Sequence, residues 1–293
     1  MIRTKLSLVA MASASALFLG SCGGSEPNDN PVVDGGDTTT EEAIDPDLFE
    51  SPPMDYHLPS PLQVASIFKK SGLEYNSGVT NSPDNSENYS SELSQMLNFG
   101  VYSADMAYCV LNEQSNEGRI YLGVISELAG EIGMEAVFAN EDLMDRFDAN
   151  LEDKDSIEIL MIDIHERTEE YMEENDMQHT SAVHFAGAWT EGMYLGVYDY
   201  ENNGEKDGLG AQITEQMAIL GNIIKGLQDP KNDGMELGWV ITDLKDIQTT
   251  FDGFGSVTAY YEDESADELI LTDEEYKSLG ELVKTLRAKI IKG

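Results

Sequence analysis

Apolar residues recur at three- and four-residue spacing along nearly the whole body of this chain, and this periodicity constrains its fold more than any other feature. One stretch carries the pattern for five helical turns: Leu93, Met96, Leu97, Gly100, Ala104, Ala107, Tyr108 and Leu111. Such spacing places apolar side chains on one face of an α-helix, whereas a half-buried strand needs strict alternation, which is scarce here. The sequence therefore predicts an all-α fold, a bundle or array of about eight helices.

The expected helices are spread along the chain from Pro59 onward. The first opens at Pro59-Ser60-Pro61, because proline suits the first turn of a helix, where its missing N–H is not needed. Helical spacing also continues through 244–261, where Gly253 and Gly255 predict a kink and a short β-hairpin is the alternative. The remaining helices are expected over 93–111, 120–134, 157–171, 183–198, 209–227 and 279–291.

The N-terminus has the features of an export signal. Two basic residues precede an apolar run, Leu6–Leu19, which is too short to span a membrane comfortably. The run ends in Leu19-Gly20-Ser21-Cys22, which resembles the signal box of bacterial lipoproteins. That resemblance implies cleavage after residue 21 and lipidation of Cys22, with residues 1–21 as the signal peptide. An ordinary secretory signal followed by a chance cysteine is the alternative.

The charge balance excludes several kinds of partner. The chain has 17 Lys+Arg against 56 Asp+Glu, for a formal net charge of −39. With no cationic surplus, it is not a general nucleic-acid binder, and its protein surface does not favour an anionic membrane. Membrane attachment is therefore expected through the N-terminal lipid. Such a charge keeps a tethered protein soluble and also occurs in proteins of saline habitats, so it identifies no partner.

Composition changes along the chain divide it into segments. Residues 22–55 are rich in Gly, Pro, Asn, Asp, Thr and Glu and contain hardly any large apolar residues, which predicts a flexible acidic stalk. Such a stalk would hold the rest of the protein about 30 Å from the lipid. Residues 56–293 are predicted to form an all-helical domain.

A pattern of residues recurs in the two halves of this domain. Residues 125–133 match residues 213–221 at an offset of 88. Three residue pairs upstream match at an offset of 86, and the difference of two residues falls in the turn between the matched segments. We expect two copies of a helical hairpin, at about 90–139 and 176–227, packed together or stacked as in repeat arrays. A chance match between helical sequences is the alternative. At an offset of 86, the matched residues are Phe99, Asp105 and Tyr108 with Phe185, Glu191 and Tyr194.

The duplicated acids Asp105 and Glu191 lie within apolar helices, where a carboxylate needs hydrogen-bond partners or a raised pKa. In one interpretation, each acid accepts hydrogen bonds from a tyrosine or a helix end and fixes how the hairpins meet. In the other, the acids and neighbouring aromatic residues line a cleft between the copies that suits a cationic or sugar-like ligand. The candidate cleft residues are Tyr102, Asp105, Tyr108, Trp189, Glu191 and Tyr194.

Small residues recur every four positions on the same two helices, as Gly100 and Ala104 and as Ala188, Gly192 and Gly196. Small side chains let helix backbones approach closely, a pattern common in membrane spans. The acids Asp105 and Glu191 argue against a span here. The stripe therefore predicts the central helix contact of a soluble bundle.

One segment has part of the spacing of a calcium-binding loop. Asp199, Glu201, Asn203 and Asp207 occupy positions 1, 3, 5 and 9 of an EF-hand-like pattern, between two expected helices. Position 12 is Gly210, where the bidentate glutamate should be. The sequence therefore predicts at best weak calcium binding, and a polar turn between helices is the alternative.

Motifs of common enzyme classes are missing from the sequence. The four histidines have no zinc-binding spacing, and we find no nucleophile elbow, phosphate loop or dinucleotide fingerprint. Cys109 has apolar neighbours, which predict a buried, unreactive thiol. We therefore expect no enzymatic activity and no cofactor other than calcium. A hydrolase that uses an unrecognised pair of acids is a weaker alternative.

From Pro59 to the C-terminus the chain resembles uncharacterised cell-envelope lipoproteins of Bacteroidetes. Three segments carry the resemblance: Pro59-Ser60-Pro61, Asn98–Asp105 and Ala186–Tyr194. It implies a helical domain in the cell envelope, with the outer membrane favoured because Gly23 replaces the aspartate of inner-membrane lipoproteins. The resemblance brings no catalytic residue.

The leading hypothesis is a lipid-anchored, non-enzymatic helical module that scaffolds an envelope protein partner. The alternative is a lipoprotein that binds a small ligand, or calcium weakly, in a cleft between the two hairpins. The two hypotheses differ in where the aromatic residues lie: an exposed patch favours a protein partner and a closed pocket favours a ligand.

Overall fold

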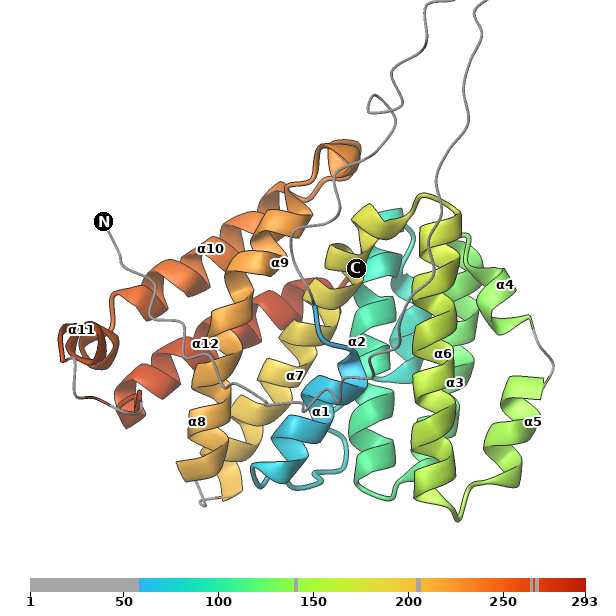
Figure 1. The fold of residues 1–293 in the computed structure, drawn as a ribbon, viewed down its shortest axis with the longest axis horizontal. Helices are drawn as coiled ribbons and strands as arrows, with labels where there is room; N and C mark the ends of the chain where they lie inside the picture. The colour runs from blue at the N-terminus through green and yellow to red at the C-terminus, as the bar shows by residue number, and fades with distance from the viewer. Residues whose placement is uncertain (1–57, 140–141, 204–206, 264–265, 267–268) are drawn as a thin grey trace, which may run out of the picture. The chain divides into compact units, whose positions relative to one another are not determined.

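Every regular element in the part of the chain that the structure describes is a helix, so the predicted all-α fold is confirmed (Figure 1). The computed structural model describes residues 58–139, 142–203, 207–263, 266 and 269–293. In chain order, the α-helices are α1 (Pro61–Lys70), α2 (Glu92–Leu111), α3 (Ser115–Glu131), α4 (Glu135–Phe138), α5 (Asp142–Ala149), α6 (Lys154–Glu174), α7 (Ser181–Asn203), α8 (Asp207–Gln216), α9 (Leu220–Leu227), α10 (Gly238–Asp252), α11 (Gly255–Glu262) and α12 (Asp273–Ile290). Short 3-10 turns are η2 (Pro83–Asn88), η3 (Gln178–Thr180), η4 (Met217–Ile219) and η5 (Pro230–Asn232).

The predicted signal peptide, the lipidated Cys22 and the stalk lie outside the described residues. The described residues belong to one compact unit, Pro52–Gly293.

The helix count differs from the expected eight because two expected helices are each broken in two and two short helices were not anticipated. The expected helix 209–227 divides into α8 and α9 at η4, where Trp189 Nε1–H donates to the Gln216 carbonyl at 3.3 Å. The stretch 244–261 divides into α10 and α11, since Phe254 adopts an extended backbone between them. The hairpin alternative there is wrong. The two short helices that were not anticipated are α4 and α5.

Helices α2 and α7 pack along each other at the centre of the domain (Figure 1). A Cβ on Gly100 of α2 would overlap the backbone carbonyl of His184, and one on Gly187 of α7 would overlap the carbonyl of Leu97. Only glycine allows so close an approach at these two positions. Of the predicted small residues, Gly100 and Ala188 lie at this central contact, whereas Gly192 faces Val64 of α1. Gly196, farther along α7, instead lies beneath the Phe68 ring of α1.

Two groups of helices flank this central pair. On one side, α3 and α6 pack against α2, and α4 and α5 pack against α3 and α6. On the other, α12, α9 and α8 pack against α7, with α10 on α9 and α12 (Figure 1). Helix α1 crosses both α2 and α7. Its N-terminus is fixed by a capping box between Ser60 and Gln63, with Pro61 in the first turn, so the predicted start of the first helix is confirmed.

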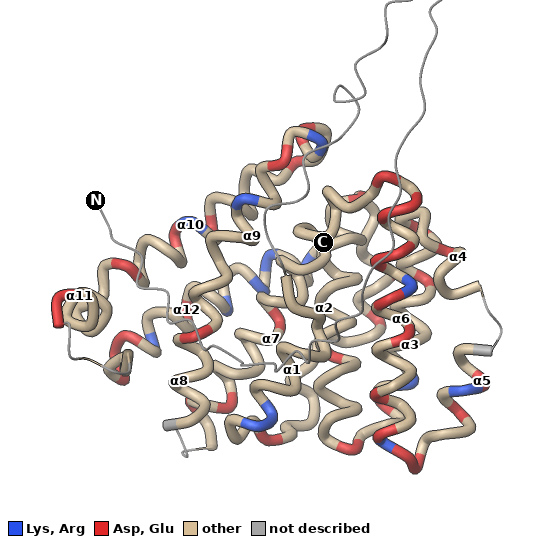
Figure 2. Tube along the Cα trace, viewed as in Figure 1, with Lys and Arg blue, Asp and Glu red and all other residues tan. Residues whose placement is uncertain are grey.

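Charge is concentrated on the flanking helices. Acidic residues are frequent along α6, whereas only Glu92 and Asp105 are acidic in α2 (Figure 2). Cys109 is buried in α2, and burial raises the pKa of its thiol. None of the helices that the structure describes has both the length and the apolar composition of a membrane span.

Candidate functional site

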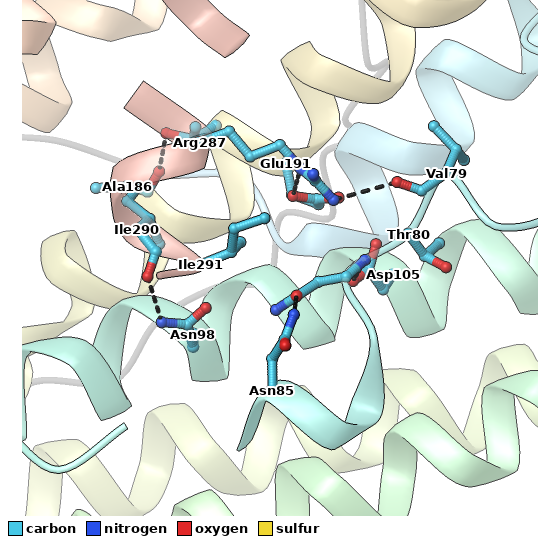
Figure 3. Close-up of polar contacts among 12 residues, drawn as sticks. Val79, Thr80, Asn85, Asn98, Asp105, Ala186, Glu191, Arg287, Ile290 and Ile291 are labelled. Carbon is cyan, nitrogen blue, oxygen red and sulfur yellow. Dashed lines mark hydrogen bonds and ion pairs between the residues drawn. The ribbon is translucent and has the colours of Figure 1, made fainter. Parts of the chain in front are cut away.

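The two duplicated acids meet in the core, together with a cation that the sequence patterns do not single out. Glu191 of α7 forms a two-point ion pair with Arg287 of α12, with Nε–Oε2 at 2.7 Å and Nη2–Oε1 at 2.8 Å (Figure 3). The Glu191 side chain is completely buried and that of Arg287 is 9% exposed. Paired hydrogen bonds of this kind are among the strongest that a carboxylate forms.

Asp105 of α2 lies beside this ion pair and is also completely buried. Its Oδ2 accepts a hydrogen bond from the backbone N–H of Asn81 at 3.1 Å, while Oδ1 has no partner within the described residues. Burial, together with the nearby Glu191 carboxylate, raises the pKa of Asp105 well above its ordinary value. A proton on Asp105 would remove the repulsion between the two carboxylates.

These groups fasten the loop between α1 and α2 to the central helices. Arg287 Nη2 donates to the Val79 carbonyl at 3.2 Å (Figure 3). Asp105 accepts from the backbone N–H of Asn81, two residues further on. Tyrosine hydroxyls secure the same loop: Tyr102 donates to the Ser82 carbonyl at 2.8 Å and Tyr108 to the Glu74 carbonyl at 2.9 Å. The acids therefore act as internal connections, but their partners are Arg287 and a loop N–H rather than the tyrosine or helix end that the first interpretation names.

The expected cleft between the hairpins is filled by side chains. Tyr102, Asp105, Tyr108, Trp189 and Glu191 are all buried, and none of the six candidates lines either of the two larger cavities. Tyr194 is half-buried beneath the Arg287 guanidinium, which lies 3.8 Å from its ring centre. At Gly100 and Gly187 the backbones of α2 and α7 are in direct contact, so the cleft expected beside the two acids is closed at these positions. The six candidates therefore do not line either of these cavities, where a ligand would have room.

The copies of the expected duplication are alike in part. Asp105 and Glu191, which correspond at the offset of 86, lie side by side, and Phe99 and Phe185 are both buried. The third pair differs, since Tyr108 bonds to the α1–α2 loop whereas Tyr194 contacts Arg287. The duplication itself stays a prediction.

The expected calcium loop is helical for most of its length. Asp199, Glu201 and Asn203 all lie in α7, which continues five residues beyond its expected end. Asp199 accepts hydrogen bonds from Glu74 N and Asn76 Nδ2, and Glu201 pairs with Lys284 at 2.6 Å. The side chain of Asp207 lies outside the described residues. Within the described part of the chain, no cluster of metal-binding side chains occurs.

A cavity of about 350 Å³ lies between α2, α6 and α7, beside the start of α1. Its wall is largely apolar, and its volume falls within the range of small-molecule sites. The apolar lining residues include Leu58, Leu62, Phe99, Met106, Ile125, Phe138, Met161, Ile164, Met172 and Phe185. A second cavity, of about 490 Å³, lies at helix ends, and its wall includes the exposed charges of Glu92, Glu236 and Lys289.

The apolar cavity also has a few polar groups in its wall. His184 of α7 is 93% buried, since only 7% of its surface is exposed, and its Nε2 has no hydrogen-bond partner among the described residues. Burial lowers the pKa of His184 to about 4, so the imidazole is neutral at pH 7. Ser103, Thr168 and Ser181 contribute hydroxyls, while His165 and the exposed Glu169 stand on α6.

Two residues of these sites were missed from the sequence. Arg287 lies on the apolar stripe of its helix, four residues after Val283 and three before Ile290, but a long basic side chain at such a position can reach water, so the spacing alone does not predict a buried cation. His184 had a usable signal: it is the one histidine within an uninterrupted apolar and small-residue stretch, Ala182–Trp189. A buried imidazole in such a stretch needs a partner, and that need indicates a site.

Comparison of this chain with protein-family models, with curated proteins and with solved structures finds no match.

Proposed function

We propose that this chain is a lipid-anchored cell-envelope protein whose helical domain binds a small, mostly apolar ligand in the cavity between α2, α6 and α7. The anchor is the expected lipid on Cys22. The observation that carries the binding function is the cavity itself: about 350 Å³ with an apolar wall and a few polar groups, one of them the unpartnered His184. Cavities of this composition are typical of ligand sites.

The positions of the aromatic residues favour a ligand over the scaffold role. The wall of the cavity includes the rings of Phe99, Phe138 and Phe185. The core buries Tyr102, Tyr108 and Trp189. The exposed large apolar side chains of the described residues are few and come from separate elements. They are Ile67 of α1, Ile120 of α3, Ile159 and Ile162 of α6, Tyr261 of α11, and Ile270 before α12.

The binding function is tested with N-phenyl-1-naphthylamine, a neutral apolar dye that fluoresces when it leaves water, and the unlipidated mature chain, residues 22–293. We expect saturable binding with one dye per chain. Ser103→Leu, which adds bulk within the cavity wall, should weaken dye binding about tenfold or more. Ser126→Leu on α3 adds the same side chain outside the cavity and should leave binding unchanged.

Equal dye binding by all three proteins, or no saturable binding by any of them, would contradict the proposal. The anchor is tested separately. Cys22→Ser should move the protein from the membrane fraction to the soluble fraction of the cells that produce it, and an unchanged membrane fraction would contradict lipidation at this residue.

A further inference from the structure

We infer that the ligand of the apolar cavity carries a neutral hydroxyl group, which hydrogen-bonds to the buried imidazole of His184 while the apolar body of the ligand fills the rest of the space. The inference rests on the proposed function, because it names the ligand class of the same cavity. The ligand is thus an alcohol of moderate size, with a chain or ring of carbon atoms as its body.

The first argument is that one ring nitrogen of His184 makes no hydrogen bond to the described residues. A neutral imidazole has one nitrogen that donates and one that accepts, and Nε2 of His184 is buried without a partner among the described residues. An unpaired polar atom in the core is costly, and the native structure rarely tolerates one without a ligand or water. A hydroxyl both donates and accepts, so it pairs with Nε2 whichever nitrogen carries the proton.

The second argument is that three of the four hydroxyls of the wall have already used their hydrogens, while the fourth, Ser60 Oγ, accepts from the Gln63 N–H at 3.2 Å. Ser103 Oγ donates to the Phe99 carbonyl at 2.7 Å, Thr168 Oγ1 to the Ile164 carbonyl at 2.8 Å, and Ser181 Oγ to Met172 Sδ at 3.6 Å. Each hydroxyl has a single hydrogen, so these three groups can only accept from a ligand. These three hydroxyls therefore favour a ligand that donates over one that only accepts, such as an ether or an ester.

The third argument concerns charge. An anionic head group would enter a cavity whose one acidic side chain among the described residues, Glu169, repels it and whose buried histidine, His184, is neutral. A cationic head group would be drawn to Glu169, but this side chain is exposed, whereas Nε2 of His184 is buried. A charge beside His184 would lose its hydration without a counter-ion. A neutral group that donates a hydrogen bond avoids both the repulsion from Glu169 and the loss of hydration that a charge would suffer beside His184.

The experiment measures displacement of the bound dye from the mature chain by four probes that share one alkyl chain: decanol, its methyl ether, decanoate and decylammonium. We expect decanol to bind about tenfold more tightly than the methyl ether, the value of one buried hydrogen bond. Decanoate should be weaker than decanol. Equal binding of decanol and ether overturns the inference, and so does tighter binding of decylammonium, which would assign the head group to Glu169.

A pair of variants assigns the preference to one imidazole. His184→Phe keeps an aromatic ring beside Phe99, and we expect the alcohol and the ether to bind it within about twofold of each other. His179→Phe removes another unpartnered imidazole, which lies outside the cavity wall, and should keep the wild-type preference. If His184→Phe retains the tenfold preference, the inference is overturned. The wild-type comparison stands even if this variant does not fold.

The two proposals fail in different ways. If neither the dye nor any of the four probes binds, the proposed function fails. If the dye and all four probes bind without regard to their head group, the cavity binds ligands and only the assignment of the hydroxyl fails.

Discussion

At the scale of single residues, the molecule depends on how its few buried charges are compensated. Glu191 is matched by Arg287, so the pair has no net charge, and Asp105 is left as the additional acid. A buried ion pair contributes little when intact, but removal of one partner leaves the other charge without compensation. The stability of the core should therefore respond strongly to changes at these three positions.

Glu191→Gln should destabilise the protein by about 3–5 kcal/mol, because it leaves the buried Arg287 guanidinium without its counter-ion. The matched control is Glu201→Gln, in the same helix, which loses a partly exposed pair with Lys284 and should cost at most about 1 kcal/mol. Urea unfolding followed by circular dichroism measures both changes. Equal losses in the two variants would contradict the role assigned to the buried pair.

Asp105→Asn should reduce the pH dependence of stability. The pKa of Asp105 is raised in the folded chain, so the folded state binds more protons than the unfolded state above about pH 4. The free energy of unfolding of the wild type therefore falls as pH rises toward the folded pKa, by at most about 1.4 kcal/mol per pH unit, and then levels off. Asparagine cannot ionise, so the variant should gain stability relative to the wild type over that window.

The measurement is urea unfolding of both proteins at a series of pH values from about 4 to 8. A difference between them that stays constant across the series would show that Asp105 ionises normally in the folded protein. Glu191 and Arg287 face this carboxyl, and both are unchanged in the variant, so they contribute equally to the two curves.

The two acids of the core were predictable from the sequence, but their setting was not. An acid within an apolar helix is conspicuous, and the repeated spacing to a tyrosine is enough to link Asp105 with Glu191. Whether such acids face a cleft or a counter-ion depends on which other helix packs over them. Here that helix is α12, about a hundred positions further along the chain, and sequence periodicity does not report contacts between distant helices.

At the scale of helices, long elements were predictable and their breaks were not. The apolar stripes of α2, α3, α6, α7 and α12 span several turns, so the helical period is unmistakable. Helix α4 has a single turn, too short to show a period, and the break between α8 and α9 involves a hydrogen bond from Trp189. Such breaks arise from tertiary contacts that no local pattern contains.

The contact between α2 and α7 gives the prediction at this scale. Gly100→Ala should destabilise the protein by about 3 kcal/mol or more, because the added methyl group overlaps the His184 carbonyl, and backbone cannot move aside as a side chain can. Gly123→Ala in α3 is the control: nothing lies within 4 Å of its Cβ, and alanine there should stabilise the helix by about 0.5–1 kcal/mol. Thermal unfolding measures both, and a loss of similar size in each would contradict the close contact.

For the whole molecule, the dominant property is the net charge of −39. Mutual repulsion of so many carboxylates opposes the folded state, and most of these groups lie on the surface, where salt screens them. The free energy of unfolding is therefore expected to be lower at low salt than at high salt. The same charge would also repel an anionic ligand before it reached the cavity.

The melting temperature should therefore rise as sodium chloride increases from about 0.01 to 1 M, over which the screening length falls from about 30 to about 3 Å. Glu170→Lys isolates the cause. Residue 170 is exposed on α6, four positions from both Glu166 and Glu174, so lysine turns two repulsions into attractions worth about 0.5–1 kcal/mol together. The variant should melt higher than the wild type at low salt and at the same temperature at high salt. A salt-independent difference between the two proteins would assign the effect to helix propensity and contradict charge repulsion as its source.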